Sequence, residues 1–239
     1  MSISYRTILL LNIVSVLEAL GIKLCIDHHI IVCNVVGGLT SNCAVIAFVA
    51  VKNLLTLGGY QLYFWVQRHH DPSRRIMLHS TAFDRWVPAL PQAYWIYSPL
   101  YYVVFNLAFL ALPNYNITVL NAWLMLMHAS FWFLRFPTRV DPILREQVRH
   151  APMDKATRLI MELVHAHDSE DNACPSMHCA LAMFIALILY PFYPFFAILF
   201  PVLVVLSCLV CKQHLIVDIV PGLALGALHG WINLQMHQL

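Results

Sequence analysis

The stretch "CKQHLIVDIVPG", residues 211–222, places a lysine, a histidine and an aspartate inside an otherwise apolar run. Charged and titratable groups are costly at membrane depth, and those that occur there usually serve a function. His214 and Asp218 are four residues apart, so on a helix they lie on one face. An aspartate so placed determines which imidazole nitrogen is free to attack or to take a proton. The same pair is also typical of a structural polar contact between helices.

The overall composition predicts an integral membrane protein. Of the 239 residues, 60% are hydrophobic and 11% are charged, whereas a soluble domain is about half apolar and about a quarter charged. The mean hydropathy is +0.70. The net charge of +2, with no basic stripe, gives no indication of a nucleic-acid partner. The seven cysteines lack paired spacing, so we expect small buried thiols rather than a disulfide framework.

Long apolar runs predict an all-α fold, a polytopic membrane bundle with six core transmembrane helices. An additional N-terminal helix is also expected, although residues 6–40 are compatible with one span, a hairpin or an interfacial helix. We divide the chain into an N-terminal segment, 1–42, and a membrane-embedded domain, 43–239. The apolar runs lie at residues 6–24, 43–66, 92–112, 117–136, 177–193, 194–211 and 214–234.

Two polar connections interrupt the apolar runs, at residues 67–86 and 135–175. Counting spans places both on one side of the membrane, together with Ser176 and the turn at 211–214. Within the longer connection, apolar residues recur at helical spacing behind Asp154. This pattern predicts an amphipathic helix that Asp154 caps and that lies at the membrane interface.

A second polar cluster, "NACPSMHCA" at residues 172–180, places Ser176 and His178 at the mouth of a span on that same side. Helix N-termini present free N–H groups that favour phosphate-like anions. Two histidines at such a site suit phosphoryl transfer, in which one attacks phosphorus and the other protonates the leaving oxygen. Together the two clusters favour a catalytic function over a structural one.

The sequences "PSMH" at 175–178 and "SCLVCKQHLIVDIVPG" at 207–222 resemble two signatures of the type 2 phosphatidic acid phosphatase superfamily. The resemblance extends over about residues 95–230. It implies that Ser176 binds the anion and that His178 is the general acid. It further implies that His214 is the nucleophile and that Asp218 orients it. The superfamily works through a phosphohistidine intermediate, without a metal or other cofactor.

The chain departs from the superfamily pattern at two positions. Met177 replaces the usual glycine, and Cys208 stands where an arginine is expected. Both changes resemble the inositol phosphorylceramide synthase and sphingomyelin synthase branch, as do residues 83–102. Lys212 and Arg139 are then the candidate phosphate-binding cations. The implied substrate is a lipid phosphate or a phospholipid, and the acceptor is water or the hydroxyl of a lipid or polyol.

Two other functions are compatible with the same residues. The first is a non-catalytic, polytopic transport or lipid-binding protein that uses the polar side chains as ligands. The second is a metal-dependent membrane hydrolase, but the spacing of the available ligands matches no closed zinc pattern, so we predict no metal. Those ligands would be His165, His167, Asp168, Asp171, Cys174 and His178.

Two indications disagree on which side of the membrane the site lies. The polar connections carry most of the arginines and lysines, which favours the cytosol by the positive-inside tendency. The resemblance implies an extracytoplasmic or lumenal site, and we adopt that orientation because arginines near the site also serve phosphate headgroups. The sequence gives no indication of the oligomeric state.

Overall fold

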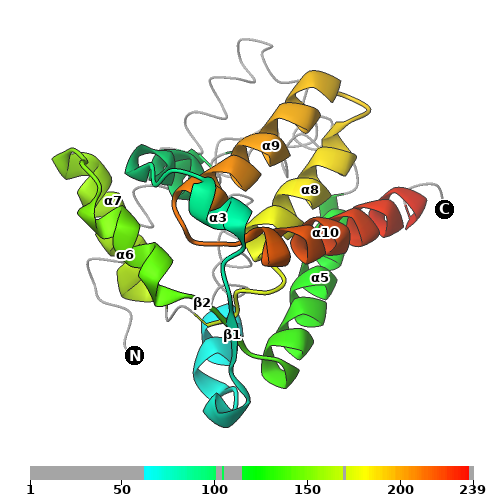
Figure 1. Cartoon of the computed structure of the whole chain (residues 1–239). Coiled ribbons are helices and arrows are strands. Elements are labelled where there is room, and N and C mark those ends of the chain that lie inside the picture. The colour runs from blue at the N-terminus through cyan, green and yellow to red at the C-terminus, as the bar shows by residue number, and fades with distance from the viewer. Residues whose placement is uncertain (1–61, 101–103, 105–114, 169–170, 237–239) are drawn as a thin grey trace, which may run out of the picture.

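The computed structural model describes residues 62–100, 104, 115–168 and 171–236, which are mostly helical (Figure 1). The predicted span at 6–24, and most of those at 43–66 and 92–112, lie outside these residues. In chain order the elements are η2 (Pro72–Arg74), β1 (Ile76–Leu78), α3 (Ala82–Trp86), η3 (Pro91–Ala93), η4 (Ile96–Leu100), α5 (Tyr115–Arg135), β2 (Thr138–Val140), α6 (Pro142–His150), α7 (Lys155–His167), α8 (Met177–Leu189), α9 (Pro194–Val210) and α10 (Ile216–Met236).

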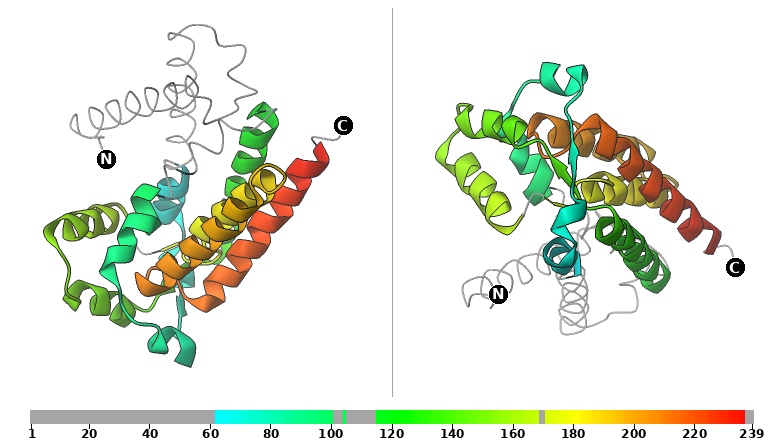
Figure 2. Two further views of the ribbon diagram at one scale, coloured as in Figure 1. Left: turned by 90° about the horizontal axis from the view of Figure 1, so that it is seen from above. Right: turned by 60° about the horizontal axis from the view of Figure 1, so that its bottom comes forward.

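Helices α5, α8, α9 and α10 form the apolar part of the molecule. Helix α8 packs against both α9 and α10, and α5 packs against α10 (Figures 1 and 2). Two segments, Ile117–Arg135 and Ile216–Met236, are long and apolar enough to cross a membrane, and α8 and α9 are shorter apolar helices. Four of the predicted spans are therefore helices, whereas the six-span bundle as a whole stays a prediction.

The two polar connections are joined by a short parallel sheet. Strand β1 pairs with β2 in a register that places Met77 opposite Arg139, and Arg139 forms a further antiparallel bridge with Asp171. The two polar connections are therefore in contact, through a sheet that was not predicted, whereas their place on one side of the membrane stays a prediction. Strands of three residues are too short to produce a periodic signal in a sequence.

The long connection between α5 and α8 contains two helices, α6 and α7, which lie to one side of the apolar helices (Figure 2). Helix α7 begins where the sequence predicts, because the Asp154 side chain accepts a hydrogen bond from the main chain of Thr157. Its Ile160 packs against the core, whereas Leu159 and Leu163 are exposed. The amphipathic helix is therefore confirmed, and its place at a membrane interface stays a prediction.

Close contact between α8 and α10 fixes how the two helices align. A Cβ atom at Gly222 would lie 2.4 Å from the Ser176 carbonyl oxygen, and one at Gly226 would lie 2.0 Å from that of Ala180. Only glycine permits two backbones to approach so closely. The main-chain N–H of Ser176 also donates to the carbonyl of Asp218 at 3.0 Å. The start of α8 is therefore held against the first turn of α10.

We expect Gly226→Ala to destabilise the protein by about 1–3 kcal/mol, because the added methyl group would meet rigid backbone. Gly230→Ala is the matched control, since its Cβ would meet side-chain atoms of Leu187, the nearest at 2.9 Å, and no backbone. Thermal unfolding of both variants in one detergent tests this expectation. Equal melting temperatures for wild type and Gly226→Ala would show that the two helices are not held at this distance.

Candidate active site

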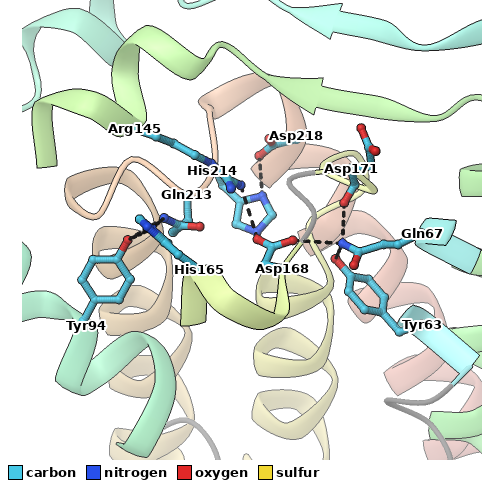
Figure 3. Close-up of polar contacts among 10 residues, drawn as sticks. All are labelled: Tyr63, Gln67, Tyr94, Arg145, His165, Asp168, Asp171, Gln213, His214 and Asp218. Carbon is cyan, nitrogen blue, oxygen red and sulfur yellow. Dashed lines mark hydrogen bonds and ion pairs between the residues drawn. The ribbon is translucent and has the colours of Figure 1, made fainter. Parts of the chain in front are cut away.

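His214 lies on the turn between α9 and α10 and contacts Asp218 directly (Figure 3). His214 Nδ1 is 3.3 Å from Asp218 Oδ1, and both side chains are buried. Asp218 Oδ1 also accepts from the main-chain N–H of Leu215 at 3.1 Å, which holds the carboxylate at the start of α10. Because Nδ1 faces the carboxylate, Nε2 is the ring nitrogen that faces away from Asp218.

The structure corrects one detail of the predicted span at 214–234. Helix α10 begins at Ile216, so His214 precedes it and does not lie on a helical face with Asp218. The two side chains meet because the turn after α9 returns His214 toward α10. In this turn Lys212 has a positive φ of 54°, and the N–H of His214 donates to the Cys208 carbonyl at 3.3 Å.

His178 is located beside His214, as the two-histidine hypothesis requires. The centroids of the two imidazole rings are 5.9 Å apart, and the His178 ring also stacks on Tyr97 at 4.0 Å. Ser176 is the N-cap of α8, and its hydroxyl accepts from the main-chain N–H of Cys179 at 3.4 Å. The two sequence clusters are therefore brought together at one place.

Arg145 of α6 is a buried cation at this site that the sequence analysis did not single out. Its Nη2 atom is 3.5 Å from Asp168 Oδ2, and its side chain lies near the imidazole of His214 (Figure 3). Asp168 Oδ1 in turn accepts from Gln67 Nε2 at 2.9 Å. The arginine is therefore held near the histidine by a carboxylate that is itself anchored to the helix at residues 62–69.

Asp171 forms the outer part of the same polar network. Its carboxylate receives two contacts from Arg75, with Nε 2.9 Å from Oδ1 and Nη2 3.0 Å from Oδ2. His70 Nε2 lies 3.6 Å from Asp171 Oδ2, and Gln67 Nε2 donates to the Asp171 carbonyl at 2.7 Å. These contacts attach the loop before α8 to the first polar connection.

A third polar group surrounds Gln213, which is buried beside His214. Its Nε2 atom lies within hydrogen-bonding distance of the Tyr94 hydroxyl and is 3.0 Å from His165 Nε2. The Tyr94 hydroxyl and His165 Nε2 are 2.8 Å apart. The turn at 211–214 is therefore anchored on this side by residues from α7 and from the segment before η4.

The two cations that the sequence predicts to bind phosphate are Arg139 and Lys212. Arg139 lies half-buried on β2. Lys212 is 1% exposed, and its Nζ atom donates to the main-chain carbonyls of Asp84 and Val87 at the end of α3. Burial lowers the pKa of Lys212, and the charge of Asp84 only partly offsets this effect. These contacts favour a structural role for Lys212 over phosphate binding.

Three of the six possible metal ligands have other partners. His165 contacts Tyr94, Asp168 contacts Arg145, and Asp171 contacts Arg75. Within the described part of the chain, no group of three or more His, Cys, Asp or Glu residues is arranged to hold a metal ion. The four described cysteines are free thiols that are buried or half-buried; they are Cys174, Cys179, Cys208 and Cys211.

Comparison with known protein families gives one match, over part of the chain. A model of the PAP2 superfamily matches residues 143–239, a segment that contains Arg145, both histidines and Asp218. This segment is similar to the superfamily that the two sequence signatures indicated, whereas residues 95–142 lie outside the match. No curated protein and no solved structure matches the chain. The match supports phosphatase or phosphoryl-transfer chemistry and does not distinguish a branch of the superfamily.

Proposed function

We propose that this protein catalyses metal-independent phosphoryl transfer on a lipid substrate through a phosphohistidine on His214. The observation that carries the proposal is the contact of His214 with Asp218 while the ring of His178 lies 5.9 Å away. The nucleophile is thereby oriented by one side chain and faces a second imidazole that can move a proton. The PAP2 match over the same residues supports this chemistry.

The reaction follows from these positions in two steps. His214 Nε2 attacks phosphorus, the bond from phosphorus to the leaving oxygen breaks, and His178 gives its proton to that oxygen. Water or an alcohol then attacks the phosphohistidine, His178 takes the proton of the attacking oxygen, and the bond between phosphorus and nitrogen breaks. Asp218 stabilises the positive charge that His214 acquires in the first step.

Charge stabilisation of the phosphoryl group is assigned to residues on both sides of His214. Ser176 and the N-terminus of α8 face the anion from one side, in the role that the sequence predicts. Arg145 is a buried cation that lies near the imidazole of His214, so we place it beside Arg139 among the phosphate-binding candidates. Lys212 is not assigned to the phosphate because its ammonium is bound to carbonyls at the end of α3.

The proposed substrate is a lipid phosphate or a phospholipid in a multi-pass membrane protein. The two helices with the length and composition of membrane spans support this choice, because one of them, Ile216–Met236, carries Asp218 in its first turn. The acceptor is water in a phosphatase, or the hydroxyl of a lipid or polyol in a headgroup transferase of the inositol phosphorylceramide synthase or sphingomyelin synthase type. We propose an extracytoplasmic or lumenal site at one membrane interface.

The function is tested with purified protein in detergent, chelator, and a panel of lipid phosphates and headgroup phospholipids. Each is incubated with and without diacylglycerol, ceramide or inositol, beside His214→Ala. Phosphate release that the variant lacks would establish a phosphatase, and transfer to an added alcohol with little free phosphate would establish a transferase. Equal silence of folded wild type and variant would contradict the proposal and favour a lipid-binding or transport protein, and activity that chelator removes would favour a metal enzyme.

Arg145→Gln is expected to lower kcat/KM by about 10²-fold, because a preorganised charge near the transferring phosphoryl group is lost. Arg149→Gln is the matched control, since Arg149 is on the same helix, exposed, and paired with Glu146. Steady-state kinetics on the preferred substrate, with the melting temperature of each variant, test the assignment. A folded Arg145→Gln enzyme with wild-type kinetics would remove Arg145 from the site.

A further inference from the structure

Helix α3 is connected to the turn that carries His214 by hydrogen bonds at two places: one involves the Lys212 side chain and the other the Asp84 side chain. The Lys212 ammonium donates to the main-chain carbonyls of Asp84 and Val87, with Nζ 2.6 Å from the carbonyl oxygen of Asp84. In return, Asp84 Oδ1 accepts from the main-chain N–H of Ile216 at 2.9 Å. The turn is therefore held at Lys212 and again at Ile216, on either side of His214.

The residues that make this connection are themselves fixed. Asp84 is 2% exposed, and its other oxygen, Oδ2, accepts from the main chain of Thr81 at 2.8 Å and from its hydroxyl at 2.6 Å in a capping box. Two further groups, both from Thr81, thus hold the carboxylate that receives the Ile216 N–H. A helix C-terminus carries partial negative charge, so the carbonyls at the end of α3 are suitable partners for a buried ammonium.

The conformation of the turn depends on this support. Lys212 has a φ of 54°, which is unfavourable for a residue with a side chain. The buried ammonium compensates by binding two carbonyls that have no helical partner beyond the end of α3. Loss of either contact releases the segment whose position determines where His214 points, because only one residue separates Lys212 from His214.

We propose that Lys212 and Asp84 are positioning residues, which hold His214 in line for attack by fastening the turn 211–216 to α3 without contacting the phosphate. The proposal rests on the proposed phosphoryl transfer for its kinetic consequence. It also assigns a function to α3 itself, in which Asp84 is buried whereas Phe83 and Trp86 are exposed. A misplacement of a nucleophile by about 1 Å costs on the order of 10² in rate.

Kinetics separate positioning from phosphate binding. Lys212→Met and Asp84→Asn are both expected to lower kcat by about 10²-fold while KM and inhibition by inorganic phosphate stay within about twofold of wild type. The double variant is expected to match the more affected single variant. Loss of either contact already releases the turn, so loss of the second contact has little further effect. Lys155→Met, at an exposed position of α7, is the matched control. A higher KM and weaker phosphate inhibition in Lys212→Met, with Asp84→Asn unaffected, would overturn the proposal and make Lys212 a phosphate ligand.

Hydrogen exchange tests the connection without activity. In both variants the amides of residues 211–216, including Ile216, are expected to exchange at least about 10-fold faster, while α5 keeps its wild-type protection. Unchanged exchange in this segment would overturn the proposal even if activity falls. If wild type and His214→Ala are equally inactive on the lipid panel, the phosphoryl-transfer function fails, whereas faster exchange would still show that α3 holds the turn.

Discussion

His214→Ala is expected to lower turnover by about 10⁴-fold or more, because the variant lacks the atom that forms the bond to phosphorus. The buried Nε2 atom has no substitute among the neighbouring side chains in this mechanism, since His178 is assigned to the proton and Asp218 to orientation. Phosphoenzyme formation is the direct measurement: after brief incubation with a labelled lipid phosphate, acid-labile and base-stable label is expected on wild type and not on the variant.

His229→Ala is the matched control for this experiment. His229 is also a buried histidine of α10, but it faces His128 of α5, with His128 Nδ1 and His229 Nε2 3.4 Å apart. Its removal is expected to affect stability and to leave the phosphoenzyme intact. Label that persists in His214→Ala would contradict the assignment of the nucleophile, and label lost equally in both variants would indicate that folding alone accounts for the result.

Asp218→Asn is expected to lower kcat by about 10²–10⁴-fold with almost no change in shape. The carboxamide is nearly isosteric, but it can present its N–H₂ group to His214 Nδ1, which favours the tautomer in which Nε2 carries the proton and cannot attack. The loss of negative charge also removes stabilisation of the imidazolium that forms. A folded variant with wild-type kcat would show that Asp218 has only a structural role.

The same variant is expected to shift the pH dependence of kcat. Burial lowers the pKa of His214, and the charge and hydrogen bond of Asp218 raise it by more, so the net pKa lies above the ordinary value. Attack requires neutral imidazole, so activity rises as pH increases through this pKa. Without the carboxylate the pKa of His214 falls, and the acid limb of the pH–rate profile is expected to move to lower pH. An unmoved or upward-shifted limb would contradict the assignment.

Local features of the structure follow closely from short stretches of sequence. The apolar helices α5, α8, α9 and α10 and the capped start of α7 occupy nearly the predicted residues, because periodicity and capping depend on neighbours within one or two turns. The closeness of His214 to Asp218 also followed from their spacing, although a turn, rather than a helical face, brings them together. The two stretches that resemble PAP2 signatures are also short, and the family match covers both of them.

Contacts between distant segments required the tertiary structure. Lys212 is a cation two residues from the nucleophile, and from the sequence a phosphate-binding role is the natural expectation; only the packing of α3 shows that Asp84 and Val87 take its ammonium. Arg145 is one of many arginines in the polar connections, and no local signal distinguishes it. Its position near His214 depends on how α6 folds back and on the Asp168 carboxylate that holds it.

The sequence by itself determined the helical class, the apolar segments, the two histidine clusters and the type of reaction they suit, because composition, periodicity and motif spacing are properties of short stretches. The tertiary structure alone decided the short sheet that joins the polar connections, the close contact of α8 with α10, and the partners of Arg145 and Lys212. These features depend on pairings between residues far apart in the chain, whose free energy is gained only when the whole fold brings them together.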